Sequence, residues 1–234
     1  MIILIFIVGG IFSLIGMFVS GKLKRKFKLY SQIQLSNQMS GAEIAAKMLQ
    51  DHDINDVQIT SVRGQLTDHY NPVNKTVNLS EVVYNERNAA AAAVAAHEVG
   101  HAVQHATAYR WIGLRSKLVP LVNISAKILN IGNMIMFMGA GALYFFGQGG
   151  FETILMVLIA ANVFMTSFAL VTLPVEFDAS NRALAWMKDK NIVTQGEYAG
   201  SADALKWAGM TYVVAALAAL ANLLVYLAMF LGRD

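Results

Sequence analysis

The residues best suited to chemistry lie in one short stretch, His97-Glu98-Val99-Gly100-His101. On a helix, residues four apart lie one turn apart on the same face, so His97 and His101 could both reach one zinc ion. Glu98 follows His97 directly and could act as the general base that takes a proton from a zinc-activated water. The spacing therefore predicts a zinc site with hydrolytic chemistry.

A catalytic zinc usually has three protein ligands and one open position. His105 is eight residues from His97, about 12 Å along a helix axis, and one ion cannot bridge that distance. We therefore expect His105 to be structural or to support a ligand from behind. His52 falls near the expected end of a helix and is assigned no role. His69 is a loop residue that could enter a cleft.

The carboxylates are the other source of a third ligand. Pro174 can start a helix just after an apolar run, which would place Glu176 in the first turns of that helix. Asp178, two residues further on, would point away from Glu176. The alternative is that either acid is solvated and stabilised by the positive end of the helix. We favour Glu176 as the third ligand.

The elements that must position these residues follow from local patterns. Residues 41–52 have the apolar spacing of a helix after Ser40, and residues 55–62 and 76–80 have the pattern of short strands. The alanine-rich stretch 88–108 predicts a helix on which the strands can pack. We expect strand 76–80 to lie at a sheet edge, where it could pair with an extended substrate.

Composition places much of the chain in lipid. Hydrophobic residues make up 56% and charged residues 14%, whereas a soluble chain is about 25% charged. This excludes an ordinary cytosolic enzyme, a disordered tail and a nucleic-acid-binding domain. The chain has no cysteine, which excludes a thiol nucleophile, a thiolate zinc site and disulfides.

Four apolar runs are long enough to cross a bilayer. A fifth span over 88–108 is rejected because that stretch contains three histidines, a glutamate and a glutamine. The expected organisation is an N-terminal anchor at 1–21, a catalytic segment at 22–117, two spans at about 118–147 and 153–173, a polar segment with the third ligand at 174–206, and a last span at 207–234.

Basic residues give the expected orientation, because they favour the cytoplasmic side. Residues 21–117 hold 12 Lys and Arg and residues 174–206 hold four, whereas the connection at 148–152 holds none. The two polar segments are thus predicted to be cytoplasmic, with the N-terminus and Arg233-Asp234 outside. The basic residues follow the first apolar run instead of preceding it, so we expect an anchor that is not cleaved.

Four motifs together resemble a known family. They are LTDHYNP (66–72), HEVGHAVQH (97–105), LVP (118–120) and LPVEFDASNRA (173–183), and they are similar to the bacterial neutral zinc metallopeptidases of the YugP-like type. The resemblance covers nearly the whole chain. It implies a membrane-bound peptidase of the gluzincin kind, with His97 and His101 as zinc ligands and Glu98 as the catalytic base.

The resemblance also implies Glu176 as the third ligand, by similarity to the E-x-x-A-D segment of HtpX-like and CAAX-protease-like membrane metallopeptidases. The final Asp of that segment is Ser180 here. Ser180 and Asp178 are therefore both candidates for supporting the zinc histidines. The donor that stabilises the oxyanion could be Arg182, His69 or Tyr70.

The sequence as a whole predicts a mainly α-helical membrane protein with about four transmembrane helices and a small α+β zincin-like catalytic segment. We expect a zinc metallopeptidase of the bacterial plasma membrane that cleaves proteins at or near the bilayer and binds no nucleic acid. Two alternatives stay open. One is an inactive zinc-binding scaffold or regulatory protein, and the other is an intramembrane protease with its histidines inside the bilayer.

Overall fold

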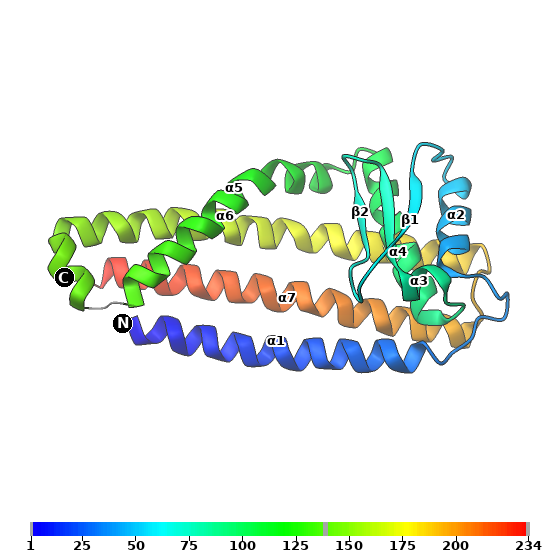
Figure 1. The fold of residues 1–234 in the computed structure, drawn as a ribbon, viewed down its shortest axis with the longest axis horizontal. Helices are drawn as coiled ribbons and strands as arrows, with labels where there is room; N and C mark the ends of the chain where they lie inside the picture. Colours follow the sequence, from blue (N-terminus) through cyan, green and yellow to red (C-terminus); the bar gives the residue numbers. More distant parts are fainter. Residues whose placement is uncertain (1, 138–139, 233–234) are drawn as a thin grey trace. The chain divides into compact units, whose positions relative to one another are not determined.

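The computed structural model describes residues 2–137 and 140–232 (Figure 1). Arg233-Asp234, expected outside the membrane, and positions 138–139 of the second apolar run lie outside the described residues. The described chain is mostly helical. Its helices are α1 (Ile2–Tyr30), α2 (Gly41–Asp51), α3 (Glu81–Asn85), α4 (Ala89–Ala106), α5 (Arg110–Phe137), α6 (Ala140–Asp189) and α7 (Gln195–Leu231).

The chain divides into two compact units. We call Met1–Phe18, Leu114–Leu173 and Tyr212–Asp234 the apolar unit, and Val19–Gly113 with Pro174–Thr211 the polar unit. Helices α1, α5, α6 and α7 contribute residues to both units. All of the residues considered above for catalysis or metal binding fall in the polar unit.

Four of the described helices are long and apolar enough to cross a membrane. They contain the candidate spans Ile3–Tyr30, Arg110–Ile135, Gly149–Asp189 and Gln195–Leu231. Helix α4 is not among the candidates found within the described residues. The prediction of a mainly helical chain with four candidate membrane spans is confirmed.

The described part of the run 118–147 lies in α5 up to Phe137 and in the first part of α6, whose backbone leaves helical geometry at Gly147, with φ 65° and ψ 177°. Glycine adopts positive φ readily, so the break falls there. Pro174 does not begin a new helix but lies inside α6. Membrane proteins tolerate prolines within helices because neighbouring groups can satisfy the freed carbonyl.

The strands form a small mixed sheet of β1 (Gln58–Val62), β2 (His69–Asn71) and β3 (Thr76–Ser80), in the order β1-β3-β2. The prediction that 76–80 is an edge strand is therefore wrong. Strand β3 pairs in parallel with β1 and antiparallel with β2, and its Val77 and Leu79 are fully buried. The edge next to β3 is occupied by β2, which is too short to show an alternating pattern in the sequence.

The two helices of the polar unit that carry most of its core begin at well-formed caps. Ser40 and Glu43 form a capping box at the start of α2, and the Asn88 side chain accepts a hydrogen bond from the Ala91 amide at the start of α4. Most of the alanines of α4 are fully buried. Their small side chains let neighbouring backbones come close to this helix.

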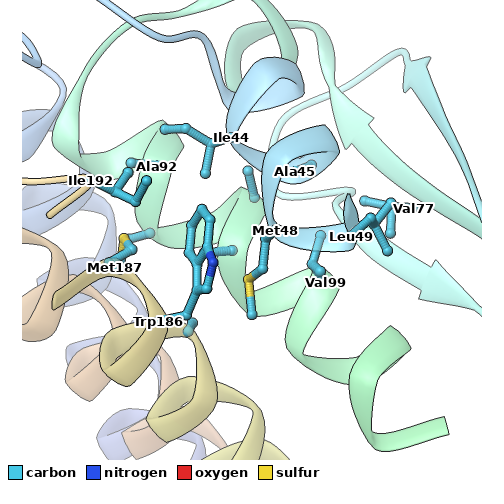
Figure 2. Packing of buried hydrophobic residues seen from close by; sticks show 14 of the residues in the cluster. Ile44, Ala45, Met48, Leu49, Val77, Ala92, Val99, Trp186, Met187 and Ile192 are labelled. Carbon is cyan, nitrogen blue, oxygen red and sulfur yellow. The ribbon is translucent and has the colours of Figure 1, made fainter. Parts of the chain in front are cut away.

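The core of the polar unit joins α6 to α2 and α4. Figure 2 shows the Trp186 ring of α6 lying against Met48 and near Ile44 of α2, with Val99 of α4 close by. The indole N–H of Trp186 donates a hydrogen bond of 3.0 Å to Asp51, at the end of α2. These contacts hold the later part of α6 in place next to the helix that carries the HEVGH sequence.

Candidate metal centre

Three side chains of the polar unit converge on one point. His97 and His101 of α4 and Glu176 of α6 each offer a ligand atom, and these atoms all lie within 4.8 Å of one another. Glu176 Oε2 is 3.3 Å from His97 Nε2 and 3.6 Å from His101 Nε2. In tetrahedral zinc sites with ligand bonds of 2.0–2.2 Å, neighbouring ligand atoms are about 3.3–3.6 Å apart. The donor atoms therefore suit a zinc ion in type, and the two distances to Glu176 fall in the range that zinc needs.

A glycine between the histidines lets the two helices come this close. A Cβ atom on Gly100 would lie 2.6 Å from the Ala179 carbonyl oxygen of α6, which is closer than real Cβ atoms approach such a neighbour. Ala179 lies one turn beyond Glu176. The backbone contact thus sits beside the donor set and fixes the separation of α4 and α6 at the distance the three ligand atoms need.

Gln104 orients the His101 ring. Its amide nitrogen donates to the Val175 carbonyl at 2.7 Å and to Asp178 Oδ2 at 2.8 Å, so its oxygen must be the atom 3.0 Å from His101 Nδ1. That oxygen can only accept, so Nδ1 carries a proton, which leaves Nε2 as the nitrogen that can bind a metal when the ring is neutral. Gln104 is fully buried, and this network holds His101 in the tautomer that binds a metal.

Ser180 takes the corresponding place behind His97. Its hydroxyl lies 3.0 Å from His97 Nδ1, one turn beyond Glu176 on α6. A hydroxyl oxygen can accept a hydrogen bond from the Nδ1–H group, which leaves Nε2 available for a metal. Both histidines thus have a partner on the ring nitrogen that faces away from the other donors.

Charge in the cluster favours a cation. Burial alone would lower the pKa of His101, but the hydrogen bond to Glu176 and the charges of Glu98 and Glu176 together raise it above its ordinary value. Two buried carboxylates close to an imidazole therefore draw positive charge to this place. A metal ion would replace the proton, because a histidine ligand must be neutral.

Glu98 lies next to the donor set and is fixed by the edge strand. Its side chain is buried, and its Oε2 accepts a 3.0 Å hydrogen bond from the Tyr70 amide of β2. The Tyr70 hydroxyl lies 3.0 Å from His105 Nδ1, two turns further along α4. Tyr70 thus links β2 to α4 through both its main chain and its side chain.

The comparisons with known proteins agree with this geometry. The model of a family described as "Putative neutral zinc metallopeptidase" matches residues 3–231. A Bacillus subtilis (strain 168) protein named "Putative membrane protease YugP" is 41% identical over 217 residues, which cover 91% of each chain. The chain belongs to this neutral zinc metallopeptidase family. No solved structure matches.

For this member of the metallopeptidase family, zinc is the implied metal, and the relative's name together with the four apolar helices indicates a membrane protein. The residues expected around the zinc divide into two groups. Those brought into or against the donor set are His97, Glu98, His101, Glu176, Ser180 and, through Gln104, Asp178. Asp178 Oδ2 accepts hydrogen bonds from Gln104 and from Arg182.

The remaining candidates lie outside the donor set. Arg182 donates to Asp178 at 2.6 Å and its guanidinium lies over the Tyr109 ring. His69 is exposed and contacts the Thr67 carbonyl through Nδ1. His105 contacts Tyr70, and His52 contacts the Met48 carbonyl at the end of α2. Of the three oxyanion candidates, it is Tyr70 that is hydrogen-bonded to Glu98, through its main-chain amide.

Gln104 is the residue that sequence reasoning missed. It lies three residues after His101, on the same helical face, and that spacing is a signal that could have identified it. Its partner, the Val175 carbonyl, could not be predicted, because every residue has a main-chain carbonyl and the residue type does not indicate which one accepts the bond.

Proposed function

We propose that the chain is a membrane-bound zinc metallopeptidase that hydrolyses peptide bonds of proteins at or near the bilayer. The observation that carries the proposal is the donor set of His97, His101 and Glu176, with Nε2–Oε2 distances of 3.3 and 3.6 Å. A zinc ion with three protein ligands keeps an open position, which is the arrangement of a catalytic site. The small α+β segment of the polar unit would then be the zincin-like part of the chain.

When bound, the zinc ion would supply a Lewis acid that polarises the scissile carbonyl and activates water at neutral pH. Glu98 would take the proton of the attacking water and pass it to the leaving nitrogen. The Tyr70 amide holds one oxygen of this carboxylate. Gln104 and Ser180 would keep the histidines in the tautomer that leaves Nε2 to the metal.

The edge strand β2 offers a place for the substrate backbone. The sheet order leaves one side of β2 unpaired with another strand, and the Tyr70 amide faces Glu98 instead of β3. A peptide that extends along this side would have its main chain beside the general base. We propose β2, and not β3, as the strand that pairs with substrate.

The polar unit is proposed to work at the cytoplasmic surface of a bacterial plasma membrane. Glu176 is three residues beyond Leu173, and the 12 basic residues of 21–117 favour the cytoplasmic side. The chain has no cysteine, so the labelling of single introduced cysteines can report which side of the membrane each position faces. Asn55→Cys and Lys190→Cys should react with an impermeant thiol reagent only after lysis, whereas Gly149→Cys should react in intact cells.

The reverse labelling pattern would place the chemistry on the outer face. Single cysteines at the exposed positions Ala106 and Thr107 that resist labelling even after lysis, in protein shown to be folded, would instead favour an intramembrane protease.

The decisive test of hydrolysis is Glu98→Gln. The amide is nearly isosteric but cannot accept a proton, so we expect one zinc per chain and an unchanged fold with hydrolysis lost. Fragments of membrane proteins should disappear when the proteome of cells with Glu98→Gln is compared with wild type. Glu81→Gln, an exposed glutamate on α3, is the matched control and should behave as wild type. Undiminished cleavage by purified Glu98→Gln would show that the mechanism is wrong, and a wild-type protein with zinc but no cleavage would favour a scaffold.

A further inference from the structure

An open pocket of about 370 Å³ lies in the polar unit, away from the residues of the metal centre. One wall is the last part of α1, and the other is made by the turn before β2 and by the junction of β3 with α3. Its lining is mostly apolar. The lining residues are Lys24, Phe27, Lys28, Ser31, Gln65, Leu66, Ser80 and Val82.

The α1 wall lies at the depth of lipid headgroups. Its residues 24, 27, 28 and 31 have the spacing of one helical face. The uncharged run of α1 ends at Gly21, so Lys24 is about 5 Å and Lys28 about 10 Å further along the helix axis. The headgroup layer is about 5–8 Å thick on each side of the hydrocarbon core. Lys24 therefore lies at the level of lipid phosphates, and the long side chain of Lys28 can reach back toward it.

The two lysines of the pocket differ from their neighbours on α1. Lys26 pairs with Asp203 at 2.8 Å, and the Lys22 ammonium lies over the Trp207 ring. Within residues 2–137 and 140–232, no ion pair or hydrogen bond involves the side chains of Lys24 and Lys28. The acid nearest in sequence to the other wall, Asp68, is held by the amide and hydroxyl of Ser80. The rim therefore carries two available positive charges.

The opposite wall exposes apolar side chains at a cost. Leu66 adopts a φ of +57° and is 49% exposed, and Val82 is 40% exposed. The left-handed conformation is unfavourable for a non-glycine residue, and a leucine this exposed gains little from burial to offset it. Strained residues of this kind often line binding sites.

We propose that this pocket binds an anionic phospholipid. The phosphate lies between the ammonium groups of Lys24 and Lys28, and the glycerol and first acyl carbons lie against Phe27, Leu66 and Val82. Basic residues that directly follow a membrane helix attract anionic lipids, and an apolar pocket adds a place for one lipid molecule. This binding is independent of peptide hydrolysis.

The test uses the full chain as Glu98→Gln, so that lipid binding is measured without proteolysis. The protein is equilibrated in bilayers of equal parts phosphatidylglycerol and phosphatidylcholine, extracted in detergent, and its retained lipid is counted by native mass spectrometry. We expect one retained phosphatidylglycerol. Lys24→Gln and Lys28→Gln should each lower its retention about fivefold. Arg25→Gln is the matched control, because it removes an exposed charge from the same turn outside the pocket, and should change retention less than about twofold.

The apolar wall is tested separately by Leu66→Asn. Asparagine tolerates positive φ, so thermal stability should hold or rise while lipid retention falls. If Arg25→Gln lowers lipid retention as much as the lysine variants do, retention depends only on the overall surface charge of α1, and the proposal is overturned. Equal retention of both lipids, full retention by Leu66→Asn, or displacement of the lipid by a soluble acidic peptide would overturn it as well.

Discussion

The two units of the chain both bury polar side chains, but they do so with different chemistry. In the polar unit, a glutamate and two histidines face one another, and Gln104 and Ser180 support the histidines from behind. In the described part of the apolar unit, the buried polar side chains are neutral: the hydroxyl of buried Tyr226 donates to the exposed Asn133, and that of buried Thr166 donates to the Ala219 carbonyl. The first cluster is arranged to hold a cation, whereas the second joins helices.

The difference predicts how each cluster responds to substitution. A buried charge that loses its partner is costly, and a metal ligand cannot be replaced by packing. A neutral hydrogen bond between membrane helices contributes much less. Substitutions should therefore abolish a function in the polar unit and only reduce stability slightly in the apolar unit.

The largest effect is expected at the three proposed ligands. His97→Ala and His101→Ala should reduce zinc from about one ion per chain to almost none, and Glu176→Ala should weaken binding strongly. Metal analysis of purified protein measures this, with Asp178→Ala and His105→Ala as controls that should retain the ion. Loss of zinc from Asp178→Ala but not from Glu176→Ala would contradict the assignment of the third ligand.

Gln104 should come next, because its loss removes the group that fixes the His101 tautomer. Gln104→Met keeps the size of the side chain but no hydrogen bond, and should weaken zinc binding about 10–100-fold. Gln104→Glu keeps an acceptor for His101 Nδ1, and combined with Asp178→Asn, which removes the charge that would face the new carboxylate, it should weaken zinc binding less. A chelator competition measures both, and circular dichroism controls for folding. Equal affinities in the two variants would show that Gln104 only fills space.

A substitution at Gly100 tests whether the close spacing of α4 and α6 is needed for stability and for zinc binding. An alanine there would gain about 1 kcal/mol of helix propensity but meet the Ala179 carbonyl, and overpacking costs about 1–3 kcal/mol. We expect Gly100→Ala to lower stability by about 1 kcal/mol and to weaken zinc binding. Gly113→Ala is the matched control, because a Cβ there meets nothing within 4 Å and should raise stability. If both variants are stabilised, the close approach is not a constraint.

The sequence predicts those parts of the molecule that are determined by residues close together in the chain. The spacing of His97 and His101, the caps at Ser40 and Asn88, and the four apolar runs are all set by residues close together in the chain. Glu176 is harder, but few acids lie near the spans, and the resemblance to a family points to the same residue.

The parts that the sequence does not predict depend on contacts between distant segments. The sheet order depends on β2, three residues long, so the central position of β3 could not be inferred from its own five residues. Pro174 is an ordinary start signal for a helix, yet α6 continues through it. The role of Gln104 rests on a main-chain carbonyl 71 positions away.

The smallest effect is expected in the apolar unit. Hydrogen bonds between membrane helices contribute about 0.6 kcal/mol on average, because the separated helices find other partners. Tyr226→Phe removes the hydroxyl that donates to Asn133 and keeps the ring, which packs with Leu155, Leu158 and Met229. Stability measured in detergent by thermal unfolding should fall by about that amount, and zinc content should not change. A drop in zinc content in Tyr226→Phe would show that the two clusters are energetically coupled, and the contrast between a cation-holding cluster and a helix-joining one would no longer hold.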